Sequence, residues 1–163
     1  MDPNSTVVHP FSNQTLVDYF KSTDMHFLRD RDDDVQISYN TTEDLGFNLK
    51  YFFRTFGDDD NLLSLRCYAE TDFPASREPE MLRAINKWND MMRWPKVVWR
   101  IVPDPERSVG YLSCEQDIDL ESGVLYRHLN DIVEGFIHGA YEFWEWLKTE
   151  ANGGFEPVND LPL

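Results

Sequence analysis

The sequence has few basic residues and few cysteines, and it has no long apolar run. Its 163 residues include 15 lysines and arginines against 30 aspartates and glutamates, a formal net charge of -15. A surface of this charge repels phosphate backbones, so nucleic acid is a poor candidate partner. No window approaches the roughly 18 consecutive apolar residues of a membrane span. Residues 1–9 also lack the pattern of a signal peptide, so we expect a cytoplasmic protein with no membrane insertion.

The only two cysteines, Cys67 and Cys114, both lie in apolar, strand-like runs. In a reducing cytosol, the expected state of such residues is a pair of buried free thiols. A disulfide between them stays an alternative at the level of the sequence.

Motifs of common catalytic and metal sites are missing as well. The chain has no Gly-x-Ser-x-Gly, no Cys-x-x-Cys and no glycine-rich phosphate loop. An aspartate-rich segment, residues 30–34, lacks the glycine and the final glutamate of a calcium-binding EF-hand. His138 and Glu142 are four residues apart on a predicted helix, where an ion pair is more common than a shared metal. We therefore expect no cofactor and no metal.

Acidic residues alternate where a predicted strand ends, and paired carboxylates can act as acid and base. These residues are Glu115, Asp117, Asp119 and Glu121. No nucleophile or base-orienting partner accompanies them, and charged groups that leave a strand edge more often keep that edge in water. The interpretation is that the protein is not an enzyme.

What the chain does have is apolar and aromatic residues, 41% and 14% of the sequence. This is enough to build a core, and the length suits one domain. We predict a flexible leader over residues 1–11, a single domain over 12–150 and a flexible tail over 151–163.

Three helices are predicted. Ser12 caps the first, which runs to about residue 23. Pro79 opens the second, over about 80–93, which places Met81, Ile85, Trp88 and Met92 on one face. The third covers about 123–150. Two of its glycines, four residues apart, predict close packing against the sheet or the first helix. These two glycines are Gly135 and Gly139.

Six strands are predicted from alternating apolar residues, with turn residues between them. They cover 25–29 with 35–39, 47–56 with 62–70, and 96–102 with 109–117, and a turn at 103–105 joins the last two. The fold class is therefore α+β, an antiparallel sheet flanked by helices.

Aromatic residues occur on both faces of the second predicted hairpin. Phe52, Phe56 and Tyr68 lie opposite the alternating apolar residues that mark the core face. Since antiparallel sheets commonly leave one face in water, these three side chains predict a second contact surface. The alternative is that another element of the same chain covers them.

The second helix supplies three further candidates for partner binding, Trp88, Met91 and Met92. Methionine-rich faces adapt to varied partners, but they also fill ordinary cores. For Trp88 the helical spacing favours the core over an interface.

Three short motifs and the order of elements carry a resemblance to a known family. The motifs are Asn86-x-Trp88-Asn89, Trp94-Pro95-Lys96-Val97, and Leu112-x-x-Glu115-x-Asp117-Ile118-Asp119-Leu120 followed by Gly123. With the order helix, hairpin, hairpin, helix, two strands, long helix, the chain resembles the bacterial YbjN family over about residues 12–148. That family shares its fold with the chaperones of type III secretion. The first half of the chain is longer and more acidic than is typical of the family.

The resemblance implies a secretion-chaperone-like antiparallel sheet flanked by helices, often in a homodimer, and an acidic surface that binds an extended or partly folded segment of a client protein. It implies no catalytic residues. The leading hypothesis is therefore a non-enzymatic, chaperone-like or regulatory module that binds a protein or peptide. Alternatives are an assembly partner that acts as a homodimer and, less favoured, a small enzyme or metal-binding protein that uses the acidic residues.

Overall fold

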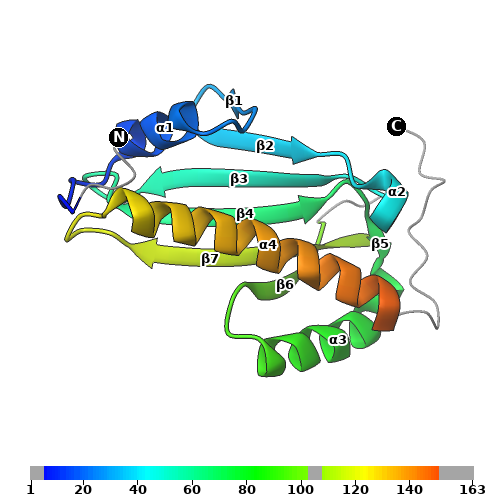
Figure 1. The fold of residues 1–163 in the computed structure, drawn as a ribbon. Helices are drawn as coiled ribbons and strands as arrows, with labels where there is room; N and C mark the ends of the chain where they lie inside the picture. The colour runs from blue at the N-terminus through cyan, green and yellow to red at the C-terminus, as the bar shows by residue number, and fades with distance from the viewer. Residues whose placement is uncertain (1–5, 103–107, 151–163) are drawn as a thin grey trace.

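A seven-stranded antiparallel sheet with its helices on one face makes up the fold (Figure 1). The computed structural model describes residues 6–102 and 108–150. The predicted α+β class is confirmed. The elements are α1 (Asn13–Ser22), β1 (Leu28–Arg29), β2 (Val35–Tyr39), α2 (Thr42–Leu45), β3 (Leu49–Phe56), β4 (Leu62–Ala69), β5 (Phe73–Pro74), the 3-10 turn η1 (Ala75–Arg77), α3 (Glu78–Met91), β6 (Lys96–Ile101), β7 (Val109–Asp119) and α4 (Tyr126–Glu150).

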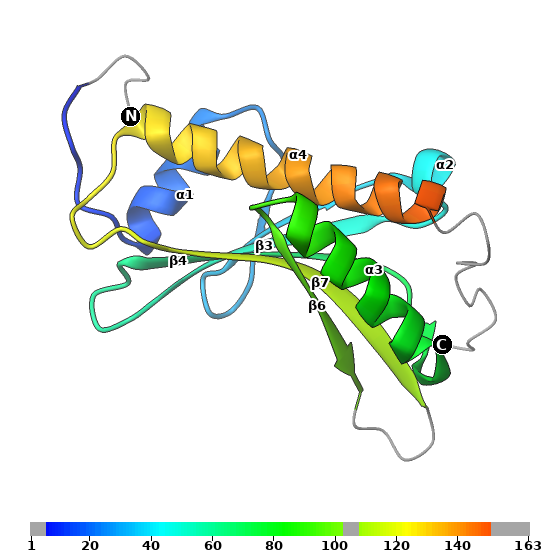
Figure 2. The same ribbon diagram turned by 90° about the horizontal axis from the view of Figure 1, so that it is seen from below.

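The long strand β7 organises the sheet. Strands β1, β2, β3, β4 and β7 follow one another, and the short β5 continues the line of β4 along β7. Strand β6 pairs with the other side of β7, from Lys96 opposite Glu115 to Ile101 opposite Gly110. The predicted turn at 103–105 between them lies outside the described residues. Seen edge on in Figure 2, the sheet has α1, α2 and α4 on the same side.

Helix α4 covers the centre of the sheet. The Phe136 ring lies 6.3 Å from that of Tyr51 and 6.4 Å from that of Phe53, and the Tyr51 hydroxyl donates to the backbone oxygen of Ile137. Residues on the helix side of β3, β4 and β7 alternate with residues on the other side, as the pleat of a strand requires. Those on the helix side are buried: Leu49, Tyr51, Phe53, Leu63, Leu65, Cys67, Leu112 and Cys114. No helix in the described part of the chain is long and apolar enough to cross a membrane.

The N-terminal helix begins as predicted, and the residues just before it also have a defined place in the fold. The Ser12 side chain accepts a hydrogen bond from the backbone N–H of Thr15, which caps α1. The prediction of a flexible leader over 1–11 is wrong for residues 9–11. His9 and Val124 exchange two backbone hydrogen bonds of 3.0 and 2.8 Å, and Phe11 is buried. Backbone pairing with the loop before α4 therefore holds this segment in place.

The first hairpin is shorter than predicted, and three short elements are additional to the prediction. Strand β1 has two residues because Met25 and Phe27, expected to be paired, pack against the core instead. The Asp30 carboxylate accepts hydrogen bonds from the N–H groups of Asp32 and Asp34, which makes the aspartate-rich segment a tight turn. Helix α2, strand β5 and turn η1 each have four residues or fewer, too few to show a period in the sequence.

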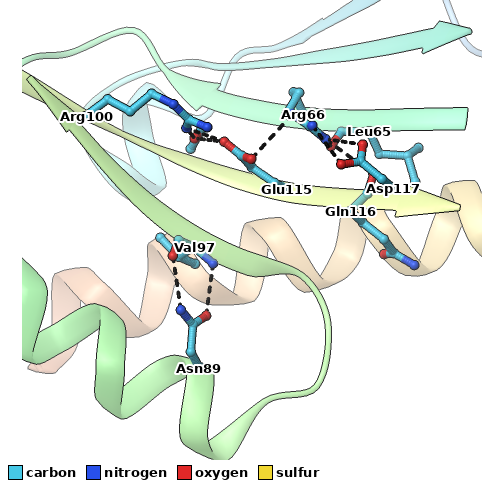
Figure 3. Close-up of polar contacts among 9 residues, drawn as sticks. Leu65, Arg66, Asn89, Val97, Arg100, Glu115, Gln116 and Asp117 are labelled. Atoms are coloured by element: carbon cyan, nitrogen blue, oxygen red, sulfur yellow. Dashed lines mark hydrogen bonds and ion pairs between the residues drawn. The ribbon is translucent and has the colours of Figure 1, made fainter. Parts of the chain in front are cut away.

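The outer edge of β6 is closed by a side chain of α3 rather than by a strand. The Asn89 amide accepts a hydrogen bond from the Val97 N–H (2.9 Å) and donates one to the Val97 carbonyl (3.1 Å), as Figure 3 shows. The neighbouring Trp88 indole donates to the Pro95 carbonyl and packs against Phe143 of α4. Together these contacts attach α3 both to the sheet edge and to α4.

Only one of the two helical glycines is closely packed. A Cβ atom on Gly139 would lie 2.9 Å from Cδ of Pro95, whereas one on Gly135 would meet nothing within 4 Å. The predicted close packing is therefore wrong for Gly135. For Gly139 the neighbour is the turn before β6, not the sheet or α1.

We predict that Asn89→Ala lowers the free energy of unfolding by about 1–3 kcal/mol, because it leaves two backbone groups of Val97 without partners. Asn86→Ala is the matched control: Asn86 lies on the same helix, is exposed and makes no hydrogen bond to a described residue. It should change stability by no more than about 0.5 kcal/mol. Urea unfolding followed by circular dichroism measures both. Equal losses for the two variants would contradict the role given to Asn89.

A second prediction concerns the glycines of α4. Gly135→Ala should raise the free energy of unfolding by about 0.5–1 kcal/mol, because alanine favours the helix and the site has room for its methyl group. Gly139→Ala should be neutral or destabilising, because its methyl group would press on Pro95. Thermal unfolding of both variants checks the difference, and a gain at Gly139 as large as that at Gly135 would show that the close contact is unimportant.

Candidate functional site

The sheet face opposite the helices carries an aromatic cluster that no described element covers. Rings of Phe52 and Tyr68 lie 5.7 Å apart, and those of Tyr68 and Tyr111 lie 5.8 Å apart. The three side chains come from β3, β4 and β7 and are half-buried. They line a shallow hollow of about 480 Å³. We call this surface, formed by Phe52, Tyr68 and Tyr111, the aromatic face.

Two pairs of opposite charges border the aromatic face. The Arg54 guanidinium lies 5.6 Å from the centre of the Phe52 ring and is 2.8 Å from a carboxylate oxygen of Asp34. Lys50 pairs with Glu70 on the neighbouring strand. The basic groups of the border are therefore neutralised by carboxylates, and the aliphatic parts of Lys50 and Arg54 extend the apolar surface.

A second group of charges lies on the same face, between β4, β7 and β6 (Figure 3). Arg66 binds Asp117 with two hydrogen bonds of 2.8 and 3.0 Å, and its Nε lies 3.6 Å from Glu115. Glu115 also accepts hydrogen bonds from Arg100 and from the Ser113 hydroxyl. We call these five residues the arginine–carboxylate network. It ties together three strands beside the aromatic face.

The network fixes the charge state of its carboxylates. Burial alone would raise the pKa of Glu115, but hydrogen bonds from Arg100 and Ser113, with the nearby Arg66 charge, hold the pKa below its usual value. Hydrogen bonding from Arg66 lowers the pKa of Asp117 in the same way. Both groups are therefore ionised near neutral pH, and neither is poised to exchange a proton there.

The interpretation of the strand-end carboxylates as solvent-facing edge charges is wrong for Glu115, whereas Asp117 is exposed and lies beyond the end of β6. Strand β7 has a partner on both sides, so Glu115 lies inside the sheet and not at its edge. Further along, the Asp119 carboxylate accepts a hydrogen bond from the Glu121 N–H and shapes the following turn. These acidic groups have structural partners.

The predicted partner-binding residues fall in two places. Phe52, Phe56 and Tyr68 all lie on the uncovered side of the sheet, with Phe56 44% exposed at the end of β3. Trp88 is 3% exposed and belongs to the core, so it contacts no partner in this conformation. Met92 packs against the core, whereas Met91 is 52% exposed at the end of α3. The predicted residues therefore form one cluster on the uncovered side of the sheet, and the exposed Met91 lies apart from it on α3.

Sequence reasoning named Glu115 and Asp117 but missed Tyr111 and the other members of the arginine–carboxylate network, which are Arg66, Arg100 and Ser113. A usable signal was present: Tyr111, Ser113, Glu115 and Asp117 alternate along β7. What was missing was the pairing of β4 with β7, which sets Arg66 opposite Glu115 and Tyr68 opposite Ser113.

Other candidate chemistry is not assembled into a site. Cys67 and Cys114 lie directly opposite each other on β4 and β7 as free, buried thiols, and burial raises the pKa of Cys67 to about 12. His138 lies 3.1 Å from Glu142 as a pair on the surface of α4. No three His, Cys, Asp or Glu side chains in the described ranges gather closely enough to hold a metal ion.

Comparisons with known proteins identify the family to which this fold belongs. Residues 14–149 match the YbjN family, described as "Putative bacterial sensory transduction regulator". No curated protein matches the chain. The solved structure of Escherichia coli YbjN, described as "a putative transcription regulator", is similar with a TM-score of 0.69 and 15% identity, over 89% of this chain and 97% of that one. At this identity the similarity shows the fold alone, and the family match shows the relationship: the chain belongs to the YbjN family.

Proposed function

We propose that this protein is a non-enzymatic cytoplasmic regulator that binds an extended or apolar segment of another protein on the aromatic face. The observation that carries the proposal is the contiguous cluster of Phe52, Tyr68 and Tyr111 on a sheet face that no described element covers. The family's description as a regulator supports it.

The composition of the surface is that of a protein interface. Binding energy concentrates in tyrosine, tryptophan and arginine side chains at the centre of an interface, surrounded by groups that exclude water. Here two tyrosines and a phenylalanine form the centre, and Arg54, Arg66 and Arg100 surround them. Aromatic side chains lose little rotational freedom on binding, so they favour association at low entropic cost.

The network gives this surface a fixed shape before a partner arrives. Arg66 and Arg100 are both bound to carboxylates in the free protein, so their side chains need little further ordering. A preordered surface loses less entropy when it binds. Because the basic groups beside the face are already paired with carboxylates, the face favours an apolar or aromatic segment over an acidic one.

We predict that Tyr68→Ser combined with Tyr111→Ser removes most partner binding while the protein stays folded, because both rings stand on the surface of the sheet and not in its core. The measurement is capture of partner proteins from bacterial lysate, quantified by mass spectrometry and compared with the wild-type chain. Partners that depend on the aromatic face should fall by about tenfold or more, as loss of a central contact predicts.

Trp94→Ser provides the matched control. It also removes an exposed aromatic ring, at the turn after α3, where the indole is 53% exposed. In parallel, a photo-crosslinking benzoylphenylalanine placed at Tyr111 should form adducts with a captured partner, and one placed at Leu82, an exposed position of α3, should not. If the wild-type chain and the double variant capture the same proteins equally, the aromatic face is not the binding site.

Self-association through the end of α3 is a second candidate function. Two large apolar side chains, Met91 and Trp94, are more than half exposed there. Two such residues on a surface are consistent with an assembly contact. If this candidate holds, multi-angle light scattering should show a dimer for the wild-type chain and a monomer for Met91→Asp with Trp94→Ser. A wild-type chain that is monomeric over a wide concentration range would exclude it.

A further inference from the structure

The two edge strands of the sheet differ in whether their outer backbone groups are bound. On one edge, Asn89 binds the backbone of Val97 and closes β6. On the other, β1 pairs only with Val35 and Gln36, which leaves Ile37–Tyr39 of β2 without a described strand alongside. In Figure 1 the short β1 lies above β2, and it pairs with only the first two residues of β2. An open edge is a template for a further strand.

The register identifies which backbone groups face this open edge. Successive residues of a strand point their N–H and C=O groups to opposite sides. Across the turn between β1 and β2, the Asp30 N–H donates to the Asp34 carbonyl over 3.1 Å, so Asp34 faces β1. Gln36 then also faces β1, and Ser38 faces outward beyond the end of β1. The Ser38 N–H and C=O are therefore the groups that an added strand would bind first.

Two hollows lie along the helix side of this edge. One, of about 530 Å³, is lined by residues from the α1–β1 connection together with Ile37, Tyr39 and Glu134. The other, of about 300 Å³, is lined by Tyr39, Glu134 and Tyr141 among others. Both hollows therefore share Tyr39 and Glu134. Alternate side chains of an extended peptide are about 6.6–6.8 Å apart on one face, so two of them can enter the two hollows on either side of Tyr39.

The charges along the hollows favour a basic side chain. No described residue forms an ion pair with Glu134, which belongs to both hollows, or with Asp24, which lines the larger one. Tyr39 and Tyr141 present rings beside Glu134 in the smaller hollow. A cation next to a carboxylate and over an aromatic face is bound by both. The net charge of -15 attracts such a segment at long range as well.

We propose that the outer edge of β2 is a second binding site, which takes an extended segment of another protein as an added strand and binds a lysine or arginine of that segment at Glu134. The site is separate from the aromatic face, since it lies on the helix side and the edge of the sheet. It requires main-chain pairing at Ser38, so the partner segment must have free N–H groups.

A peptide array tests the proposal. Its members are acetylated heptapeptides of threonine and valine in which positions 3 and 5, which share a face, carry every combination of lysine, arginine, glutamate and leucine. The wild-type protein should bind peptides with a basic residue at one position and leucine at the other at least about tenfold more tightly than peptides with glutamate at both positions. On binding, the Ser38 amide should exchange its hydrogen more slowly, because it becomes part of a ladder.

Two variants separate the charge from the strand pairing. Glu134→Gln should weaken binding of the basic peptides by about tenfold, the size of one charge-assisted hydrogen bond. Glu145→Gln is the matched control, since it removes the same charge from an exposed position of α4 outside both hollows. Ser38→Pro should abolish binding, because proline removes the outward N–H without affecting the pairing with β3.

The outcomes that overturn the proposal are equally definite. They are no binding by any member of the array, equal binding of basic and acidic peptides, or peptide binding that survives Ser38→Pro. The Tyr68→Ser, Tyr111→Ser protein should bind the array like the wild-type chain. Loss of peptide binding in that variant, with its fold intact by circular dichroism, would assign the peptides to the aromatic face instead.

Discussion

The packing of α4 across β3, β4 and β7 is the contact on which the rest of the structure depends. It buries one side of the central strands around Tyr51, Phe53 and Phe136, and it supplies the Phe143 ring against which Trp88 fixes α3. Since α1, α2 and α4 lie on the same side of the sheet, the opposite side has no described cover. The position of the aromatic face is thus a consequence of where the helices pack.

An uncovered sheet face must stay in water without attracting other chains at random. Here the polar positions of that face are paired with one another across strands, through Arg66 with Asp117 and Arg100 with Glu115. The same pairs neutralise the two arginines beside Tyr68 and Tyr111. Charge pairing therefore has two effects. It stabilises the pairing of β4, β7 and β6, and it leaves the aromatic rings as the part of the face whose burial by a partner contributes most binding free energy.

Sequence patterns predicted the strands and helices that have one buried side. They did not predict the contacts that depend on which strands pair with each other. Alternation in β3 and β4 separated Tyr51 and Phe53 from Phe52, and the stripe of α4 was long enough to be recognised. The register of β4 against β7 is a contact between distant segments, so neither the partners of Glu115 nor the place of Tyr111 beside Tyr68 could be predicted. The role of Asn89 could not be predicted either, because the sequence does not show whether an asparagine on a helix faces water or binds the backbone of a sheet edge.

Strand β3 connects the two proposed sites while keeping them apart. Tyr51 and Phe52 are consecutive, yet Tyr51 lines the smaller hollow beside β2 and Phe52 lines the aromatic face. The pleat sends them to opposite sides, so a side chain changed on one side leaves the other side's contacts in place. Communication between the sites would require a change in the sheet itself, and β2 is the strand best placed for it, because beyond Gln36 β3 is the only described strand that pairs with it. A strand added at Ser38 would hold β2 from both sides and, through β3, steady the surface on which Phe52 stands.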